Sequence, residues 1–153
     1  MPDAANLAPQ TGKSDLSARF LGSWTLVSVE QTLPSGEVLK PFGDDPSGLI
    51  LYAAGGHMSA QLGNGNPKRF ASDDFMAASD GEAAAAWRMY ISYWGTFKID
   101  ASRRVIVHKV EGSLFSNWIG TEQVRHFSFD DADLLTLEAE SPSGRSTLTW
   151  RRM

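Results

Sequence analysis

The sequence predicts an all-β protein, an eight-stranded antiparallel up-and-down barrel with a short helical insertion between strands three and four. Eight extended segments with alternating side chains follow one another along the 153 residues, with short turns between them. No helices alternate regularly with these segments, which argues against a parallel sheet. An open meander would leave two unpaired edges. Closing eight strands into a barrel removes the edges and leaves room for one small ligand.

The first half of the chain supplies three of the strands. Residues 1–13 are polar and contain proline, which predicts a disordered leader before a single domain at 14–153. Ser14 or Asp15 is placed to cap a short helix that Gly22 ends. Between turn signals such as PSG and GG, three strands are expected, at 24–32, 48–54 and 57–63.

The helical insertion is expected within residues 72–91. Ser79 and Glu82 form a capping-box pattern before AAAAWRMY, and Trp87 and Tyr90 share a helical face with two alanines. This helix is a candidate lid over one mouth of the barrel. Five more strands follow it, at 93–100, 103–112, 120–130, 134–140 and 145–153.

Composition excludes several functions. The net charge of −4 and the scattered basic residues argue against a nucleic-acid partner. The chain has no cysteine, which excludes disulfides and thiolate catalysis. It shows no apolar signal segment and no apolar run of about 20 residues. We therefore expect a cytoplasmic protein, a monomer or homodimer, that does not partner a membrane.

Side-chain alternation predicts which polar residues enter the barrel. On 120–130, Gln123 and Arg125 share a face with two phenylalanines, one of them Phe127, which marks that face as interior. His126 lies on the opposite, polar face. On 103–112, His108 shares its face with isoleucine and valine and therefore points inward. The pattern does not fix the register of the two strands, so contact between His108 and Arg125 stays open.

Aromatic residues are expected to surround the same interior. Tyr93 and Phe97 face inward on one strand, and Gly95 between them is expected to leave room for a ligand. Trp118 lies in the loop after the fifth strand, where it can cover a barrel mouth. Trp24 is expected to pack the barrel floor.

The inward face of HMSAQL (57–62) is not decided by its pattern. The apolar set of Met58, Ala60 and Leu62 is the default. However, Ser59 and Gln61 are unusual on a solvated hairpin without charge, which makes them alternative ligand-binding residues.

Arg125 has two interpretations. A buried guanidinium costs several kcal/mol unless it is paired. It is either a structural partner of Glu30, Glu111 or Glu138, or a clamp for a ligand carboxylate or enolate.

His108 is either a hydrogen-bonded core residue or a general acid/base. In the second case a neighbouring Arg125 would lower its pKa and stabilise an enolate formed by proton abstraction. Because His57, His108 and His126 lie on different strands and faces, no metal site is expected, and nothing indicates a cofactor.

Four segments resemble a known family. FLGSWTLVSVE (20–30) contains the Gly-x-Trp of lipocalin-like barrels, as Gly22 and Trp24. The resemblance continues through three further segments, PFGDDPSGLILYAAGGHMSAQL (41–62), YWGTFKID (93–100) and VIVHKVEGSLFSNWIGTEQVRHFSF (105–129). Over about residues 16–150 the chain is similar to the small, mostly microbial lipocalin-like domain family. This resemblance implies a closed barrel with a hydrophobic cavity, in proteins some of which accompany enzymes of secondary metabolism.

Two functions are therefore expected. The first is binding of a small hydrophobic, aromatic ligand with an anionic or carbonyl group. Its contacts would be Gln123, Arg125, Tyr93, Phe97, Trp118, Phe127, Ser59 and Gln61. The alternative is a cofactor-free isomerase or cyclase acting on an enolisable polyketide-like or aromatic substrate. There His108 would be the general acid/base and Arg125 the oxyanion stabiliser.

Overall fold

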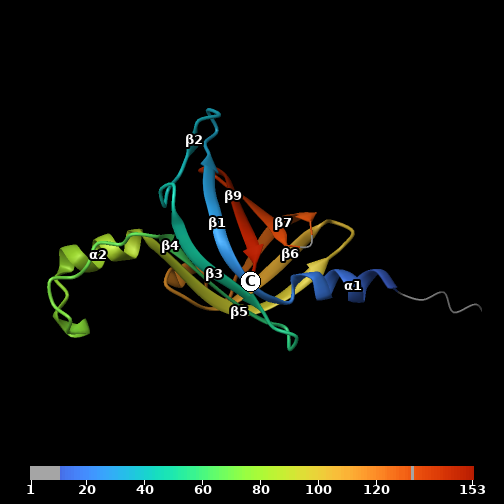
Figure 1. Cartoon of the computed structure of the whole chain (residues 1–153), viewed down its shortest axis with the longest axis horizontal. Helices are drawn as coiled ribbons and strands as arrows, with labels where there is room; N and C mark the ends of the chain where they lie inside the picture. The colour runs from blue at the N-terminus through green and yellow to red at the C-terminus, as the bar shows by residue number, and fades with distance from the viewer. Residues whose placement is uncertain (1–10, 132) are drawn as a thin grey trace, which may run out of the picture.

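A closed antiparallel barrel forms the body of the protein, as predicted. The structure, a computed structural model, describes residues 11–131 and 133–153 (Figure 1). β1 (Gly22–Thr32) closes the barrel against β9 (Gly144–Arg152), which removes both edges of the meander. Between them the wall continues through β3 (Pro46–Tyr52), β4 (His57–Asn64), β5 (Tyr90–Asp100), β6 (Val105–Ser113), β7 (Glu122–Asp131) and β8 (Leu134–Ser141).

Two short elements at the start of the chain differ from the prediction. Helix α1 (Thr11–Phe20) contains most of the expected short helix but starts before its predicted cap, inside the expected leader. Residues 1–10 of that leader lie outside the described part of the chain. The short strand β2 (Val38–Leu39) extends the sheet beside the end of β1. With two exposed residues, β2 has no alternation of buried and exposed side chains that would reveal it in the sequence.

The helical insertion follows β4 and contains a single-turn η1 (Phe75–Ala77) and helix α2 (Asp80–Arg88). The capping box is confirmed: the Glu82 amide donates to Ser79 Oγ at 3.3 Å, and the Ser79 amide donates to Glu82 Oε2 at 2.9 Å. Tyr90, expected on this helix, begins β5 instead. In Figure 1, α2 projects away from the barrel, and none of its side chains is buried.

One end of the barrel interior is filled by aromatic rings. Phe20, at the end of α1, packs edge-to-face against Tyr52, Phe127 and Phe129, with centroids 4.9 to 5.6 Å apart. Trp24 is fully buried, and its indole N–H donates to the Phe20 carbonyl at 2.8 Å. The predicted floor-packing role of Trp24 is therefore confirmed. We call these five residues the packed floor.

Gly95 lies where β5 and β6 shift register. A Cβ at this position would lie 1.9 Å from the Lys109 carbonyl oxygen. The expectation that Gly95 leaves room for a ligand is wrong, because the backbone of β6 occupies that space.

No helix among the residues described is long and apolar enough to cross a membrane.

Candidate ligand-binding cavity

Part of the barrel interior is open. The cavity there has a volume of about 420 Å³. None of the five packed-floor residues lines it. Its apolar wall includes Val29, Ile50, Leu62, Leu137, Leu148 and Trp150.

Four of the predicted ligand-binding residues line this cavity, namely Tyr93, Trp118, Gln123 and Arg125. The register that the sequence left open places Gln123 directly opposite His108, and Arg125 opposite Ile106. Arg125 is therefore a diagonal neighbour of His108 across the β6–β7 pair. Strands β5 and β7 and one loop thus bring polar groups to one region of the cavity wall.

Phe97 and Phe127 point inward, as their alternation predicts, but they do not line the cavity. Phe97 packs against Tyr52 at 4.9 Å, and Phe127 packs against Phe20 at 4.9 Å. Both belong to the filled part of the interior. Alternation gives the direction of a side chain, but it cannot tell a packed level of a barrel from a hollow one.

Ser59 and Gln61 are not brought to the cavity. They lie on the outer face of β4, where Gln61 Nε2 donates to Ser59 Oγ at 2.7 Å. Met58, Ala60 and Leu62 are buried between and beside them. The apolar set faces inward, and the polar pair is explained by its mutual hydrogen bond.

Arg125 is held beside Gln123 by weak contacts. Its guanidinium donates to the Val124 carbonyl at 3.1 Å and to Gln123 Oε1 at 3.4 Å. The Gln123 amide donates in turn to Thr121 Oγ1 at 3.0 Å. Since a guanidinium has five N–H donors, these bonds leave donors of Arg125 available to a ligand or water.

An ion pair, one of the two interpretations of Arg125, is not found. Within residues 11–131 and 133–153, no carboxylate of Glu30, Glu111 or Glu138 lies within ion-pair distance of it. The Arg125 charge therefore faces the cavity region without an anionic partner in the described part of the chain.

His108 lies between two tyrosines. The Tyr52 hydroxyl is hydrogen-bonded to His108 Nε2 at 2.8 Å, and the Tyr93 hydroxyl is hydrogen-bonded to His108 Nδ1 at 2.9 Å. Burial, and to a smaller extent the positive charge of Arg125, lowers the pKa of His108 to about 3. The imidazole is therefore neutral at physiological pH.

This arrangement favours the core interpretation of His108 over the catalytic one. His108 is fully buried, it does not line the cavity, and both ring nitrogens already have partners. Tyr93 reaches the cavity in its place. Tyr52, the second partner, was missed by sequence analysis because it sits at the end of an apolar strand with no polar pattern around it.

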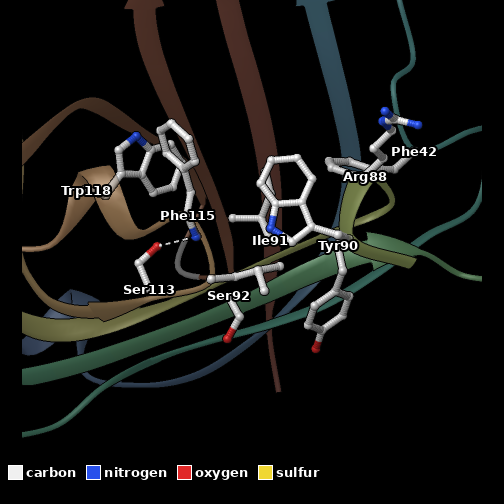
Figure 2. A pocket seen from close by; sticks show the side chains of 10 residues that line it. Phe42, Arg88, Tyr90, Ile91, Ser92, Ser113, Phe115 and Trp118 are labelled. Carbon is white, nitrogen blue, oxygen red and sulfur yellow. Dashed lines mark hydrogen bonds between the residues drawn. The ribbon is translucent and has the colours of Figure 1, made fainter. Parts of the chain in front are cut away.

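A smaller cavity of about 210 Å³ adjoins the barrel cavity (Figure 2). Trp118 lies between the two cavities, edge-to-face with Tyr93 at 5.6 Å and with Phe115 at 5.8 Å. Trp87 at the end of α2 lines the outer side of the small cavity, at 6.4 Å from Phe115. Three residues line both cavities, namely Phe42, Ile91 and Trp118.

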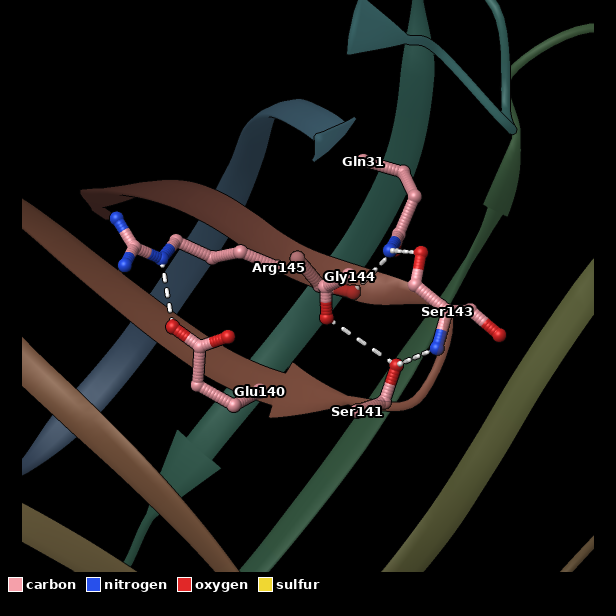
Figure 3. A network of polar contacts seen from close by, with 7 residues as sticks. Gln31, Glu140, Ser141, Ser143, Gly144 and Arg145 are labelled. Atoms are coloured by element: carbon pink, nitrogen blue, oxygen red, sulfur yellow. Dashed lines mark hydrogen bonds and ion pairs between the residues drawn. The ribbon is translucent and has the colours of Figure 1, made fainter. Parts of the chain in front are cut away.

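A polar network fixes another part of the cavity rim (Figure 3). Gln31 on β1 donates to the Ser143 carbonyl at 3.1 Å and accepts from Ser146 Oγ at 2.6 Å. Beside it, Arg145 is paired with Glu140 at 2.8 Å. These bonds tie β1 to the β8–β9 turn. They leave the polar atoms here largely paired, in contrast to Arg125.

The described residues contain no group of three or more His, Cys, Asp or Glu side chains that could hold a metal ion. His57 and His126 are both exposed, on β4 and β7 respectively, while His108 is enclosed.

Comparison with known proteins identifies the family. Residues 21–153 match the model of a lipocalin-like domain. The chain is 36% identical over 107 residues to the 4'-hydroxy-3'-methoxypropiophenone carrier protein ppsC of Aspergillus oryzae, covering 63% of this chain and 96% of that one. Among solved structures, a de novo designed fluorescence-activating β-barrel has a TM-score of 0.46 at 10% identity, covering 91% of this chain and 98% of that one. Wild-type UnaG, a fluorescent protein, has a TM-score of 0.43 at 15% identity, covering 89% and 98%. The chain belongs to the lipocalin-like domain family.

Proposed function

We propose that the protein binds a small, largely apolar aromatic molecule inside the barrel and carries it without changing it. The observation that carries this proposal is a largely apolar cavity in which Arg125, Gln123 and Tyr93 form a polar region, in addition to the paired network at the rim. Sites for small molecules typically combine apolar walls with a few polar groups that fix the orientation of the ligand. The volume of about 420 Å³ suits a molecule with one aromatic ring.

Arg125 supports a ligand with a carbonyl or anionic group. Its guanidinium can donate two parallel hydrogen bonds to an oxygen-bearing group. Within the described ranges the residue has no carboxylate partner that would compete for those donors. A ligand oxygen at this point would therefore gain a charge-assisted contact without breaking an ion pair.

The related carrier from Aspergillus oryzae supports the aromatic part of the proposal. Its name specifies an aryl ketone as the molecule carried. An aryl ketone combines a flat apolar body with a carbonyl acceptor, which matches the division of this cavity. A ligand of that class also agrees with a role in secondary metabolism.

The enzyme alternative has less support. A cofactor-free isomerase or cyclase using His108 needs the imidazole within reach of the substrate. Here both nitrogens of His108 are bonded to tyrosines, and Tyr93 separates the ring from the cavity. Arg125 alone can orient an acceptor group, which is what a carrier requires.

Binding can be tested by calorimetry and by quenching of tryptophan fluorescence, since Trp118 and Trp150 line the cavity. The probe is 4'-hydroxy-3'-methoxypropiophenone, the compound named for the relative. Saturable binding is expected in the wild type. Arg125→Met should weaken it by roughly 10- to 100-fold, the equivalent of losing a charge-assisted hydrogen bond. Arg103→Met, at an exposed position in the β5–β6 turn, is the matched control and should bind normally.

Two results would count against the carrier proposal. One is the absence of saturable binding by the folded wild type; equal affinity in the wild type and Arg125→Met would count only against Arg125 as the polar contact. The other is chemical conversion of the probe, detected by mass spectrometry, that disappears in His108→Gln. That second result would restore the isomerase alternative.

A further inference from the structure

Three buried side chains connect the packed floor with the cavity. Tyr52 and Tyr93 are 2% and 5% exposed, and His108 between them is fully buried. We propose that the Tyr52–His108–Tyr93 chain fixes the direction of the Tyr93 hydroxyl, so that its hydrogen points into the cavity and donates to a carbonyl or oxyanion of the ligand. This inference rests on the proposed function and specifies the chemical group held at the polar end.

The number of hydrogens in the chain permits two arrangements. Neutral His108 carries one N–H, and each tyrosine carries one O–H, which makes three hydrogens for two hydrogen bonds. One hydrogen is therefore left over at an end of the chain. If His108 is protonated on Nε2, the spare hydrogen belongs to Tyr52. If His108 is protonated on Nδ1, the spare hydrogen belongs to Tyr93.

The Tyr52 end cannot use a spare hydrogen. Among the described residues, the Tyr52 hydroxyl has His108 as its hydrogen-bond partner, and its ring is enclosed by Phe20 and Phe97. A hydroxyl hydrogen pointing into these rings would be buried and unpaired. Such a group disfavours the arrangement by roughly 5- to 150-fold in population.

The Tyr93 end can use it, because Tyr93 lines the cavity. Arg125 acts in the same direction, since the guanidinium can only donate hydrogen bonds. It lies close enough to the Tyr93 hydroxyl to oppose, by charge and hydrogen bonding, the rise in the Tyr93 pKa that burial causes. With His108 Nδ1 donating to the Tyr93 oxygen and the Arg125 cation nearby, the Tyr93 hydrogen is left to point into the cavity.

The cavity wall contains a further donor. Trp150 lines the cavity, and its buried indole N–H has no hydrogen-bond partner among residues 11–131 and 133–153. An indole N–H donates and cannot accept. Its nitrogen is itself enclosed, so Arg125 and Tyr93 are the donors that the cavity offers to a ligand whose polar group accepts hydrogen bonds.

The proton arrangement is tested first without ligand. His57→Gln combined with His126→Gln leaves His108 as the single histidine, and both replaced residues are exposed. In ¹⁵N-histidine-labelled protein, the nitrogen that shows one-bond coupling to hydrogen is the protonated one. We expect Nδ1. Protonation of Nε2 would overturn the proposal whatever ligand the protein binds.

The donor role of Tyr93 is tested with two matched probes. Propiophenone has a carbonyl, and propylbenzene is the same molecule without it. The wild type should prefer propiophenone. Tyr93→Phe keeps the ring beside Trp118, and it should lose roughly tenfold in affinity for propiophenone and nothing for propylbenzene. Tyr90→Phe, at an exposed position on the same strand, should behave as the wild type.

The outcomes separate this inference from the proposed function. If Tyr93→Phe keeps the full preference for propiophenone, the Tyr93 hydroxyl is not the donor and the inference fails, while the carrier function stands. If the wild type binds neither probe nor the methoxylated ketone, the carrier function fails and so does the role of Tyr93 toward a ligand. The position of the proton on His108 is then still decided by the coupling measurement.

Discussion

The two halves of the barrel interior share one wall and differ in what fills it. In the packed floor, Phe20 reaches in from α1 and contacts three rings at 4.9 to 5.6 Å. In the other half, residues such as Ala60 and Leu62 leave about 420 Å³ open. The difference shows that strand closure alone does not make a binding site. Which side chains fill each level of the barrel decides whether a cavity remains. Here Phe20 of helix α1 fills one end.

Polar groups follow the same division. Toward the floor, the buried Tyr52 hydroxyl and His108 Nε2 are hydrogen-bonded to each other. Toward the cavity, Arg125 has N–H donors without a protein acceptor in the described part of the chain. A fully paired polar group stabilises the fold, whereas an unpaired donor beside open space is available for a ligand.

The largest change in stability is expected from removing the Phe20 side chain from the packed floor. Phe20→Ala deletes a fully buried ring with three aromatic neighbours. It should lower the free energy of unfolding by about 3–5 kcal/mol, measured by urea denaturation, because the packed floor can collapse only in part.

Phe75→Ala is the control for this substitution. Phe75 is 92% exposed in the projecting insertion, and its replacement should change stability by less than about 0.5 kcal/mol. If Phe20→Ala were as mild as Phe75→Ala, the floor would not be a packed unit and the contrast between the halves would be lost.

His108, which lies between the packed floor and the cavity, predicts that the stability of the fold depends on pH. The pKa of His108 is lowered to about 3 in the folded protein by burial and by the Arg125 charge, and returns to the ordinary value of 6.5 on unfolding. Below pH 6.5 the unfolded chain binds a proton that the folded chain does not. Stability should therefore be complete above that pH and fall by about 2 kcal/mol by about pH 5.

Urea denaturation between about pH 8 and about pH 5 measures this loss. The range stops above the pKa of carboxyls such as Asp44, Glu82 and Asp100, which neighbouring donors lower. His108→Gln should remove the pH dependence, whatever its own stability. His126→Gln, on the exposed face of β7, should keep it. A wild-type stability that is flat over this range would mean that His108 is not enclosed.

Much of the wall could be predicted from the sequence. Alternation identified the strands and correctly separated inward His108 from outward His126, because buried and exposed side chains alternate around both residues. It also placed Gln123 and Arg125 toward the interior, where they line the cavity. These inferences need only local periodicity.

Features that depend on distant segments could not be predicted. Phe127 packs against Phe20, which arrives from a helix outside the barrel wall, and Phe97 packs against Tyr52 on a distant strand. The pairing of His108 with Tyr52 joins residues 56 positions apart and depends on how the whole barrel closes. Alternation shows which side chains point inward, but it contains no information about what they meet there.

The smallest effect on stability is expected from filling the hollow half. Ala60 lines the cavity, so Ala60→Leu should extend into open space and change stability by less than about 1 kcal/mol. The same substitution should weaken binding of an aryl ketone at least roughly tenfold, because the new side chain occupies the place of the ligand.

Val110→Phe is the matched test of the filled interior, because Val110 is 1% exposed in the core and does not line the cavity. With a comparable increase in bulk, it should cost about 1–3 kcal/mol by overpacking. Equal stability losses in Ala60→Leu and Val110→Phe would show that the interior is packed throughout. A large loss of stability in Val110→Phe, together with loss of binding but not of stability in Ala60→Leu, would support separate roles. The filled part of the interior would then stabilise the fold, and the open part would bind the ligand.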